Sequence, residues 1–80
     1  MWYINTMITF KKDTTLTVIT DFDETNDNIL NELEDIFEEG EKVDATIINE
    51  ETHKGEAYVD LQFADGSMAL GVLRENFEVL

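Results

Sequence analysis

The chain has 80 residues, a formal net charge of −14 at pH 7 and no cysteine. This length suits one domain, residues 1–80, with a single modest core, and the lack of cysteine excludes disulfides and thiolate metal sites. The charge argues against binding to nucleic acid or to an anionic membrane, and it favours a basic protein surface as partner. No apolar run approaches the roughly 18 residues that span a membrane. Residues 1–7 also lack the features of a signal peptide, and we therefore expect a cytoplasmic protein.

Alternating apolar and polar residues predict strands near both ends of the chain. The expected strands are residues 2–10, 14–20, 42–49, 57–63 and 67–73. The first two are separated by a short polar break and are expected to pair as a hairpin. Asp65-Gly66 predicts the turn before the last strand. The tail, residues 74–80, is ambiguous between a helical turn and a strand, with Phe77 and Leu80 expected to pack.

Residues 26–39 carry the pattern of an amphipathic helix. The apolar positions repeat at the spacing of one helical stripe and are Ile29, Leu30, Leu33, Ile36 and Phe37. Thr25 is a suitable N-cap and Gly40 a suitable stop. The resulting order β-β-α-β-β-β predicts an α+β fold, in which one antiparallel sheet of about five strands carries the helix on one face. A small, strongly curled barrel is the alternative.

The negative charge is concentrated in the middle of the chain. Residues 21–51 contain thirteen acids and one lysine, a net charge of −12. On the expected helix, six carboxylates would lie opposite the apolar stripe: Asp27, Glu32, Glu34, Asp35, Glu38 and Glu39. Along the helix axis they would give one charge per roughly 3 Å, which is close to the 3.4 Å spacing in one strand of duplex DNA. The helix would tolerate repulsion between acids four residues apart without any compensating lysine.

These features predict a protein-binding inhibitor that is not an enzyme and needs no cofactor or metal. It would occupy the basic, nucleic-acid-binding groove of a partner enzyme by charge mimicry, and we expect an anti-defence protein of a phage or mobile element, of the anti-restriction or anti-CRISPR type. The residues expected to bind the partner are Asp23, Glu24, Asp27, Glu32, Glu34, Asp35, Glu38 and Glu39. The alternatives are an immunity or antitoxin-like neutraliser of a basic nuclease, and a small cytosolic domain with a weak divalent-cation site. A homodimer is also possible.

Two motifs in residues 18–32 suggest chemistry of other kinds. An apolar strand followed by Asp-x-Asp-x-Thr resembles the first motif of haloacid-dehalogenase-type phosphatases, and the resemblance implies a nucleophile at Asp21, an acid/base at Asp23 and a magnesium ion. It covers eight residues, whereas that family needs a parallel sheet and further motifs. The same segment partly matches a calcium loop but has Asn26 where that loop requires glycine. His53 is expected to be an exposed turn residue.

Overall fold

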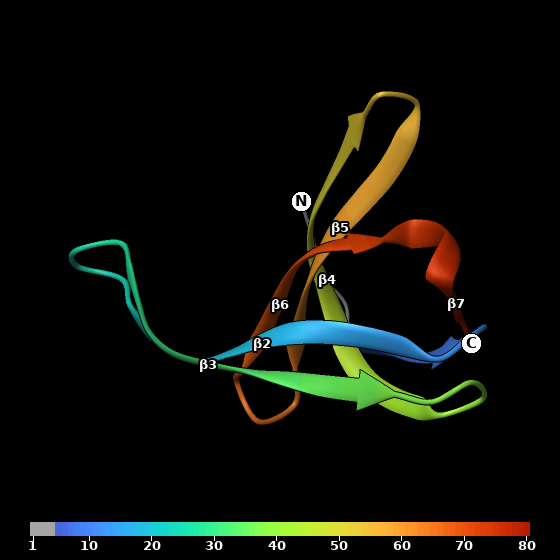
Figure 1. The fold of residues 1–80 in the computed structure, drawn as a ribbon, viewed down its shortest axis with the longest axis horizontal. Helices are drawn as coiled ribbons and strands as arrows, with labels where there is room; N and C mark the ends of the chain where they lie inside the picture. Colours follow the sequence, from blue (N-terminus) through green and yellow to red (C-terminus); the bar gives the residue numbers. More distant parts are fainter. Residues whose placement is uncertain (1–4) are drawn as a thin grey trace.

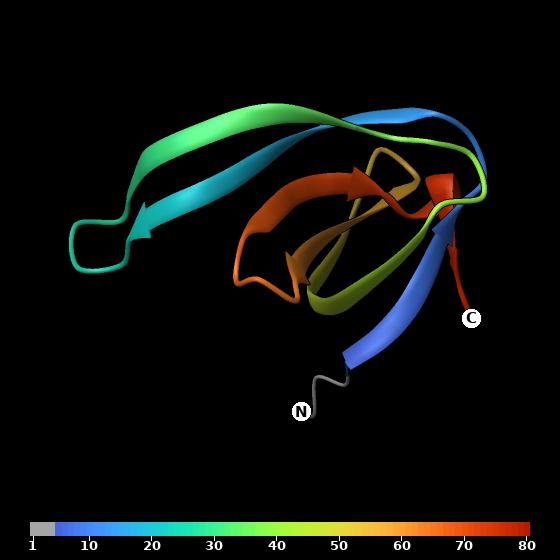
Figure 2. The same ribbon diagram turned by 90° about the horizontal axis from the view of Figure 1, so that it is seen from below.

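The computed structural model describes residues 5–80, which form a strongly curled, antiparallel β-sheet (Figures 1 and 2). Its strands are β1 (Asn5–Phe10), β2 (Thr14–Asp23), β3 (Asn28–Phe37), β4 (Lys42–His53), β5 (Glu56–Phe63), β6 (Met68–Leu73) and β7 (Phe77–Val79). A short 3-10 helix, Arg74–Asn76, precedes β7. The part of the first predicted strand at residues 2–4, and the signal-peptide interpretation of residues 1–4, lie outside the described residues.

The α+β prediction is wrong, because residues 5–80 contain no α-helix and residues 28–37 form a strand. The apolar pattern gave the wrong prediction because a spacing of four residues fits both a helix and a strand. Four residues make about one turn of a helix and also two full repeats of a strand. Ile29, Leu33 and Phe37 therefore share a face in either conformation. Only Leu30 and Ile36 distinguish the two, and both are exposed in the structure, at 59% and 63%.

Two effects explain why the strand is preferred over the helix. A helix would bring Glu34 close to Glu38 and Asp35 close to Glu39, at about 6 Å, whereas an extended chain separates residues four apart by roughly 13 Å. The strand also pairs with β2, which is rich in β-branched residues that favour sheets. Opposite the acids of β3, β2 presents Leu16, Thr17 and Ile19, none of them charged.

The strand order in the sheet is β3-β2-β6-β5-β4-β1-β7. The predicted hairpin of the first two strands is wrong: β1 pairs with β4 and β7, whereas β2 pairs with β3 and β6. The expected antiparallel pairing of the later strands is present, with Asp65 and Gly66 in the turn between β5 and β6. The tail combines both predicted conformations, a helical turn followed by a strand.

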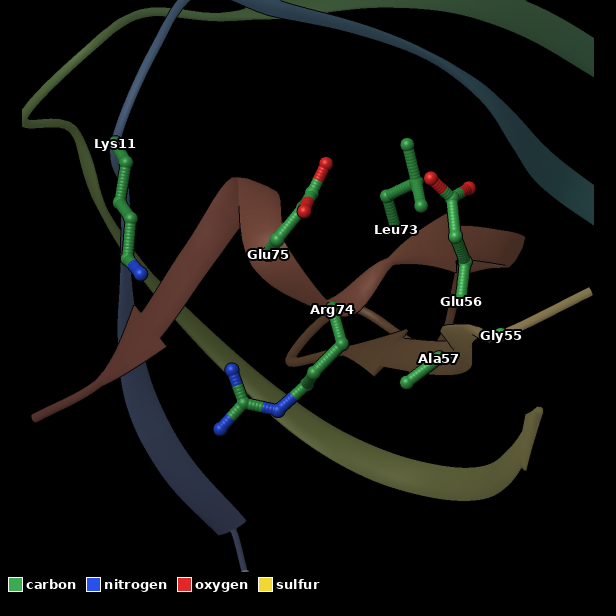
Figure 3. Close-up of a pocket in the computed structure, with 7 residues that line it drawn as sticks. All are labelled: Lys11, Gly55, Glu56, Ala57, Leu73, Arg74 and Glu75. Atoms are coloured by element: carbon green, nitrogen blue, oxygen red, sulfur yellow. The ribbon is translucent and has the colours of Figure 1, made fainter.

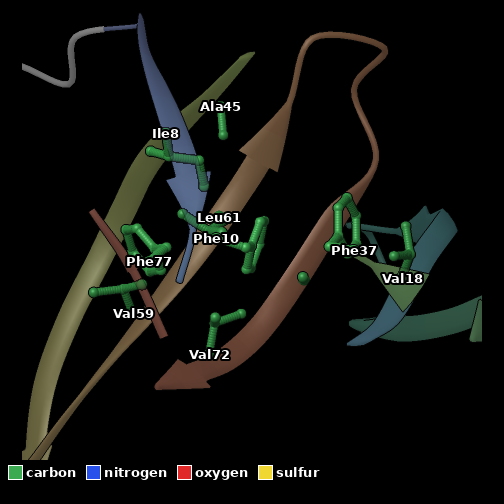
Figure 4. Close-up of a cluster of buried hydrophobic side chains, with 10 residues drawn as sticks. Ile8, Phe10, Val18, Phe37, Ala45, Val59, Leu61, Val72 and Phe77 are labelled. Atoms are coloured by element: carbon green, nitrogen blue, oxygen red, sulfur yellow. The ribbon is translucent and has the colours of Figure 1, made fainter. Parts of the chain in front are cut away.

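The core fills the inside of the curled sheet (Figure 4). The connected cluster of buried side chains consists of Ile8, Phe10, Val18, Phe37, Ala45, Val59, Leu61, Ala69, Val72 and Phe77. Phe37 stacks on Phe10 at 5.0 Å and on Phe63 at 5.5 Å between ring centroids. Phe10 belongs to the strand next to β7, so these contacts bring the end of β3 close to the opposite edge of the sheet. Phe77 is buried as expected, but Leu80 is 59% exposed.

An irregularity in β6 changes which of its residues face the core. Gly71 has φ of +68°, and the register between β5 and β6 shifts next to it. Asp60 fixes this site by accepting hydrogen bonds from the Gly71 N–H at 2.9 Å and from the Asn49 side chain at 3.3 Å. As a result Ala69 and Val72 are buried, whereas Leu70, which strict alternation places inside, is 51% exposed.

Candidate functional site

The β2–β3 hairpin, residues 14–37, projects beyond the rest of the molecule, and we call it the arm (Figures 1 and 2). On its other side β2 pairs with β6 only at Val18 and Ile19. Residues 20–31 of the arm are therefore a two-stranded ribbon without a third described strand beside it. Isolated two-stranded ribbons are marginally stable in water. The arm is thus the part of the described chain with the least support from the core.

β3 is an edge strand, and almost all of it is exposed. No described strand pairs with its outer edge, and nine of its ten residues are exposed, Phe37 being the exception. Eight large apolar side chains are exposed in residues 5–80, and four belong to β3: Ile29, Leu30, Leu33 and Ile36. A long exposed edge with apolar side chains can pair with another chain, and proteins normally shield such edges. β3 contains neither lysine nor proline, two common means of shielding.

The arm carries seven carboxylates and no lysine, arginine or histidine. Every residue expected to bind the partner lies on or next to it. Asp23, Glu24 and Asp27 lie at the tip, Glu32, Glu34 and Asp35 along β3, and Glu38 and Glu39 in the turn after β3. They do not form one helical strip, because side chains alternate between the faces of a strand. Glu32 and Glu34 share one face, and Asp35 lies on the other.

Asp23 organises the turn at the tip of the arm. Its carboxylate accepts hydrogen bonds from the Asn26 side chain at 2.8 Å, and from the backbone N–H groups of Thr25 at 3.0 Å and Asn26 at 3.3 Å. These donors hold the pKa of Asp23 below its ordinary value, with the Asn26 side chain having the largest effect. Asp27 completes the turn with a φ of +56°. Asp23 therefore has a structural role in this turn.

An open groove of about 460 Å³ runs along the inner face of the arm, between the arm and the β3–β4 and β5–β6 connections. Its apolar part is formed by Val18, Leu33, Phe37, Val43 and Phe63. Its acidic part is formed by Asp35, Glu41, Asp44 and Asp65, with Lys42 as the one basic residue in the lining. The groove thus combines apolar surface with an excess of carboxylates directly beside β3.

A second pocket, of about 330 Å³, lies across the molecule between Lys11, the start of β5 and the 3-10 helix (Figure 3). Glu56, Arg74 and Glu75 also line it. The Arg74 guanidinium lies 4.8 Å from the centre of the Phe77 ring and donates a hydrogen bond to the Phe77 carbonyl at 3.1 Å. Arg74 therefore holds the 3-10 helix against β7, and we assign no catalytic or binding role to this pocket.

The two motifs that suggested metal chemistry lie in an antiparallel ribbon. Asp21 is exposed near the end of β2, and Asp23 binds the turn beyond it. The phosphatase motif instead requires a parallel sheet, so the resemblance does not extend to the fold. No group of three or more His, Cys, Asp or Glu residues in the described part of the chain is placed to hold a metal ion. His53 is exposed as expected, but it is the last residue of β4 and precedes the turn.

Comparison with protein-family models, curated proteins and solved structures finds no match to this chain. Residues 5–80 contain no helix of the length and apolar character needed to cross a membrane.

Sequence reasoning missed the apolar half of the candidate site. It assigned Ile29, Leu30, Leu33 and Ile36 to a buried helical stripe, whereas the structure exposes all four on an edge strand. One signal against the helix was present in the sequence, namely the absence of any base to offset the acids of residues 26–39. The β-branched run of residues 14–20, which needs a neighbouring strand, was another.

Proposed function

We propose that this chain is a non-catalytic inhibitor that binds a basic surface of a partner protein through its arm. The observation that carries the proposal is the exposed edge of β3, where four apolar side chains lie among three carboxylates and no base is present. Apolar surface and charge of one sign together favour a partner with apolar and basic groups. Such a surface serves binding, and the Asp23 carboxylate is engaged by three hydrogen bonds within the turn at the tip of the arm.

Grooves that hold nucleic acid are a natural target for such an arm. They carry lysine and arginine side chains arranged to contact a chain of phosphates, and this contact is strongly salt-dependent. The arm is a slender projection with seven carboxylates, so it could enter a groove that the rest of the molecule could not. A nucleic-acid-binding enzyme, including one that acts in defence against foreign DNA, is therefore the partner class we propose, with the cytoplasm as the compartment.

Two charge-reversed variants with equal net charge test the location of the binding surface. Glu32→Lys with Glu34→Lys alters the arm, and Glu50→Lys with Glu51→Lys alters exposed acids in the distal part of β4. We expect a partner captured from the native host at low salt to bind the arm variant at least about tenfold more weakly, equivalent to ~1.4 kcal/mol. The β4 variant should bind nearly as well as the unaltered protein.

Salt provides the second readout of the same experiment. At about 1 M salt the Debye length falls to roughly 3 Å, so a charge-driven complex should dissociate. Equal loss of binding in both variants would show that only the net charge matters. Full binding by the arm variant would show that the partner surface lies elsewhere on the chain.

A further inference from the structure

The outer edge of β3 offers a row of backbone groups to another strand. In an antiparallel pair, successive residues of a strand point their N–H and C=O groups alternately toward and away from the neighbouring strand. β3 pairs with β2 over nearly all of its ten residues, so about half of its backbone groups point outward. No described strand meets these groups. The edge can therefore accept a strand of similar length.

Both faces of this edge offer the same combination of chemical groups. One face carries Leu30, Glu32, Glu34 and Ile36, which are all exposed. The other carries Leu33 and Asp35, which line the groove beside the acidic residues Glu41 and Asp44. An added strand would direct its side chains alternately to these two faces. Apolar groups and long cationic side chains, whose methylene stems can cover apolar surface, would satisfy both faces.

A second copy of this chain is a poor occupant of the edge. Each copy would bring a net charge of −14, and two β3 strands would meet with Glu32, Glu34 and Asp35 near the same residues of the other copy. Like charges opposite one another in a sheet destabilise the pairing. The charge therefore selects against self-association and in favour of a basic partner strand.

We infer that β3 binds its partner by strand addition, and that the occupant is an extended segment that carries both basic and apolar residues on each of its two faces. This inference rests on the proposed function and specifies how the partner is held. The main-chain hydrogen bonds supply affinity that does not depend on charge, and the two faces of β3 select the side chains. The β2–β3 pair, which is the end of the sheet in the described residues, would become a three-stranded ribbon and gain support along residues 20–31.

A synthetic peptide that repeats Lys-Lys-Val-Val, matched to β3 in length, provides the probe, because this order places lysine and valine on both faces of a strand. Its control has the same sequence with every lysine in the D form, which keeps the charge and composition but cannot continue a regular ladder of L-residues. We expect the control to bind at least about tenfold more weakly, equivalent to ~1.4 kcal/mol. Hydrogen exchange should show that the L-peptide protects the outward amides of β3, which exchange rapidly in the free protein.

The possible outcomes separate this inference from the function on which it rests. Equal binding of both peptides, or binding without protection of the outward amides, would overturn strand addition. The proposal that the arm binds a basic partner through its charge would still stand. If the L-peptide binds the Glu32→Lys, Glu34→Lys variant as tightly as it binds the unaltered protein, both proposals are overturned. If the outward amides become protected when the protein concentration is raised without any peptide, a second copy is the occupant. This result would also overturn the inference.

Discussion

Phe37 anchors the arm to the core, whereas its neighbour Ile36 belongs to the exposed surface. Phe37 is 7% exposed, and its ring stacks on Phe10 of β1 and Phe63 of β5, neither of which pairs with β3. Ile36 is 63% exposed on the other face of β3. Two adjacent apolar residues thus serve different purposes, because a strand turns successive side chains to opposite faces.

Alanine substitutions at these two neighbours should differ widely in their effect on stability. Phe37→Ala removes a buried aromatic side chain and should lower the free energy of unfolding by about 3–5 kcal/mol. Ile36→Ala removes no buried contact and should change it by less than about 0.5 kcal/mol. Urea denaturation of the two variants measures both values. A large loss of stability in Ile36→Ala would mean that this side chain is buried in solution.

The arm is the element on which the functional account depends, and its two halves differ in support. The proximal half adjoins β6 at Val18 and Ile19 and ends at the buried Phe37. The distal half, residues 20–31, is held by pairing between β2 and β3 and by the hydrogen bonds of Asp23 in the turn. Segments with few buried contacts open at a lower free-energy cost than core strands.

Hydrogen exchange in the free protein should therefore divide the chain into two parts. We expect the amides of residues 20–31 to exchange much faster than those of β5, whose Val59 and Leu61 are fully buried. Exchange rates followed by NMR would measure the difference. Comparable protection in both parts would indicate that the arm has a support that the described contacts do not provide.

Most of the strands were predictable, because their burial follows a period of two. The alternation around Ile8 and Phe10, and that around Val59 and Leu61, agrees with the observed burial. The strand at residues 28–37 could not be recognised in this way, since its four-residue apolar spacing also fits a helix. Burial in β6 departs from this period, because the positive φ of Gly71 reverses the alternation within the strand.

The candidate site was predictable in its charge but not in its shape. All eight acids expected to bind a partner lie on the arm or in the turn after it. Their arrangement depends on which strand pairs with β2, and this is a long-range choice that local patterns do not encode. The exposed apolar residues of β3 could not be inferred while they were assigned to the buried face of a helix.

At the scale of the whole molecule, charge and exposed apolar surface coincide on one side. The arm holds seven of the nineteen acids and four of the eight exposed large apolar side chains of the described chain. The remaining exposed apolar residues, Met7, Leu70, Val79 and Leu80, are distributed over three other strands and the C-terminal residue. The proposed partner-binding surface is the part of the molecule where the two coincide.

The most direct measurement is a map of backbone NMR shifts across the chain during titration with the lysine–valine peptide. We predict that the changes concentrate in residues 28–37 and in the groove residues Val43 and Asp44, and that the distal part of β4 around Glu50 and Glu51 changes little. Equal changes at all acidic segments would mean that the peptide responds to net charge alone. Changes centred on Glu50 and Glu51 would contradict the account.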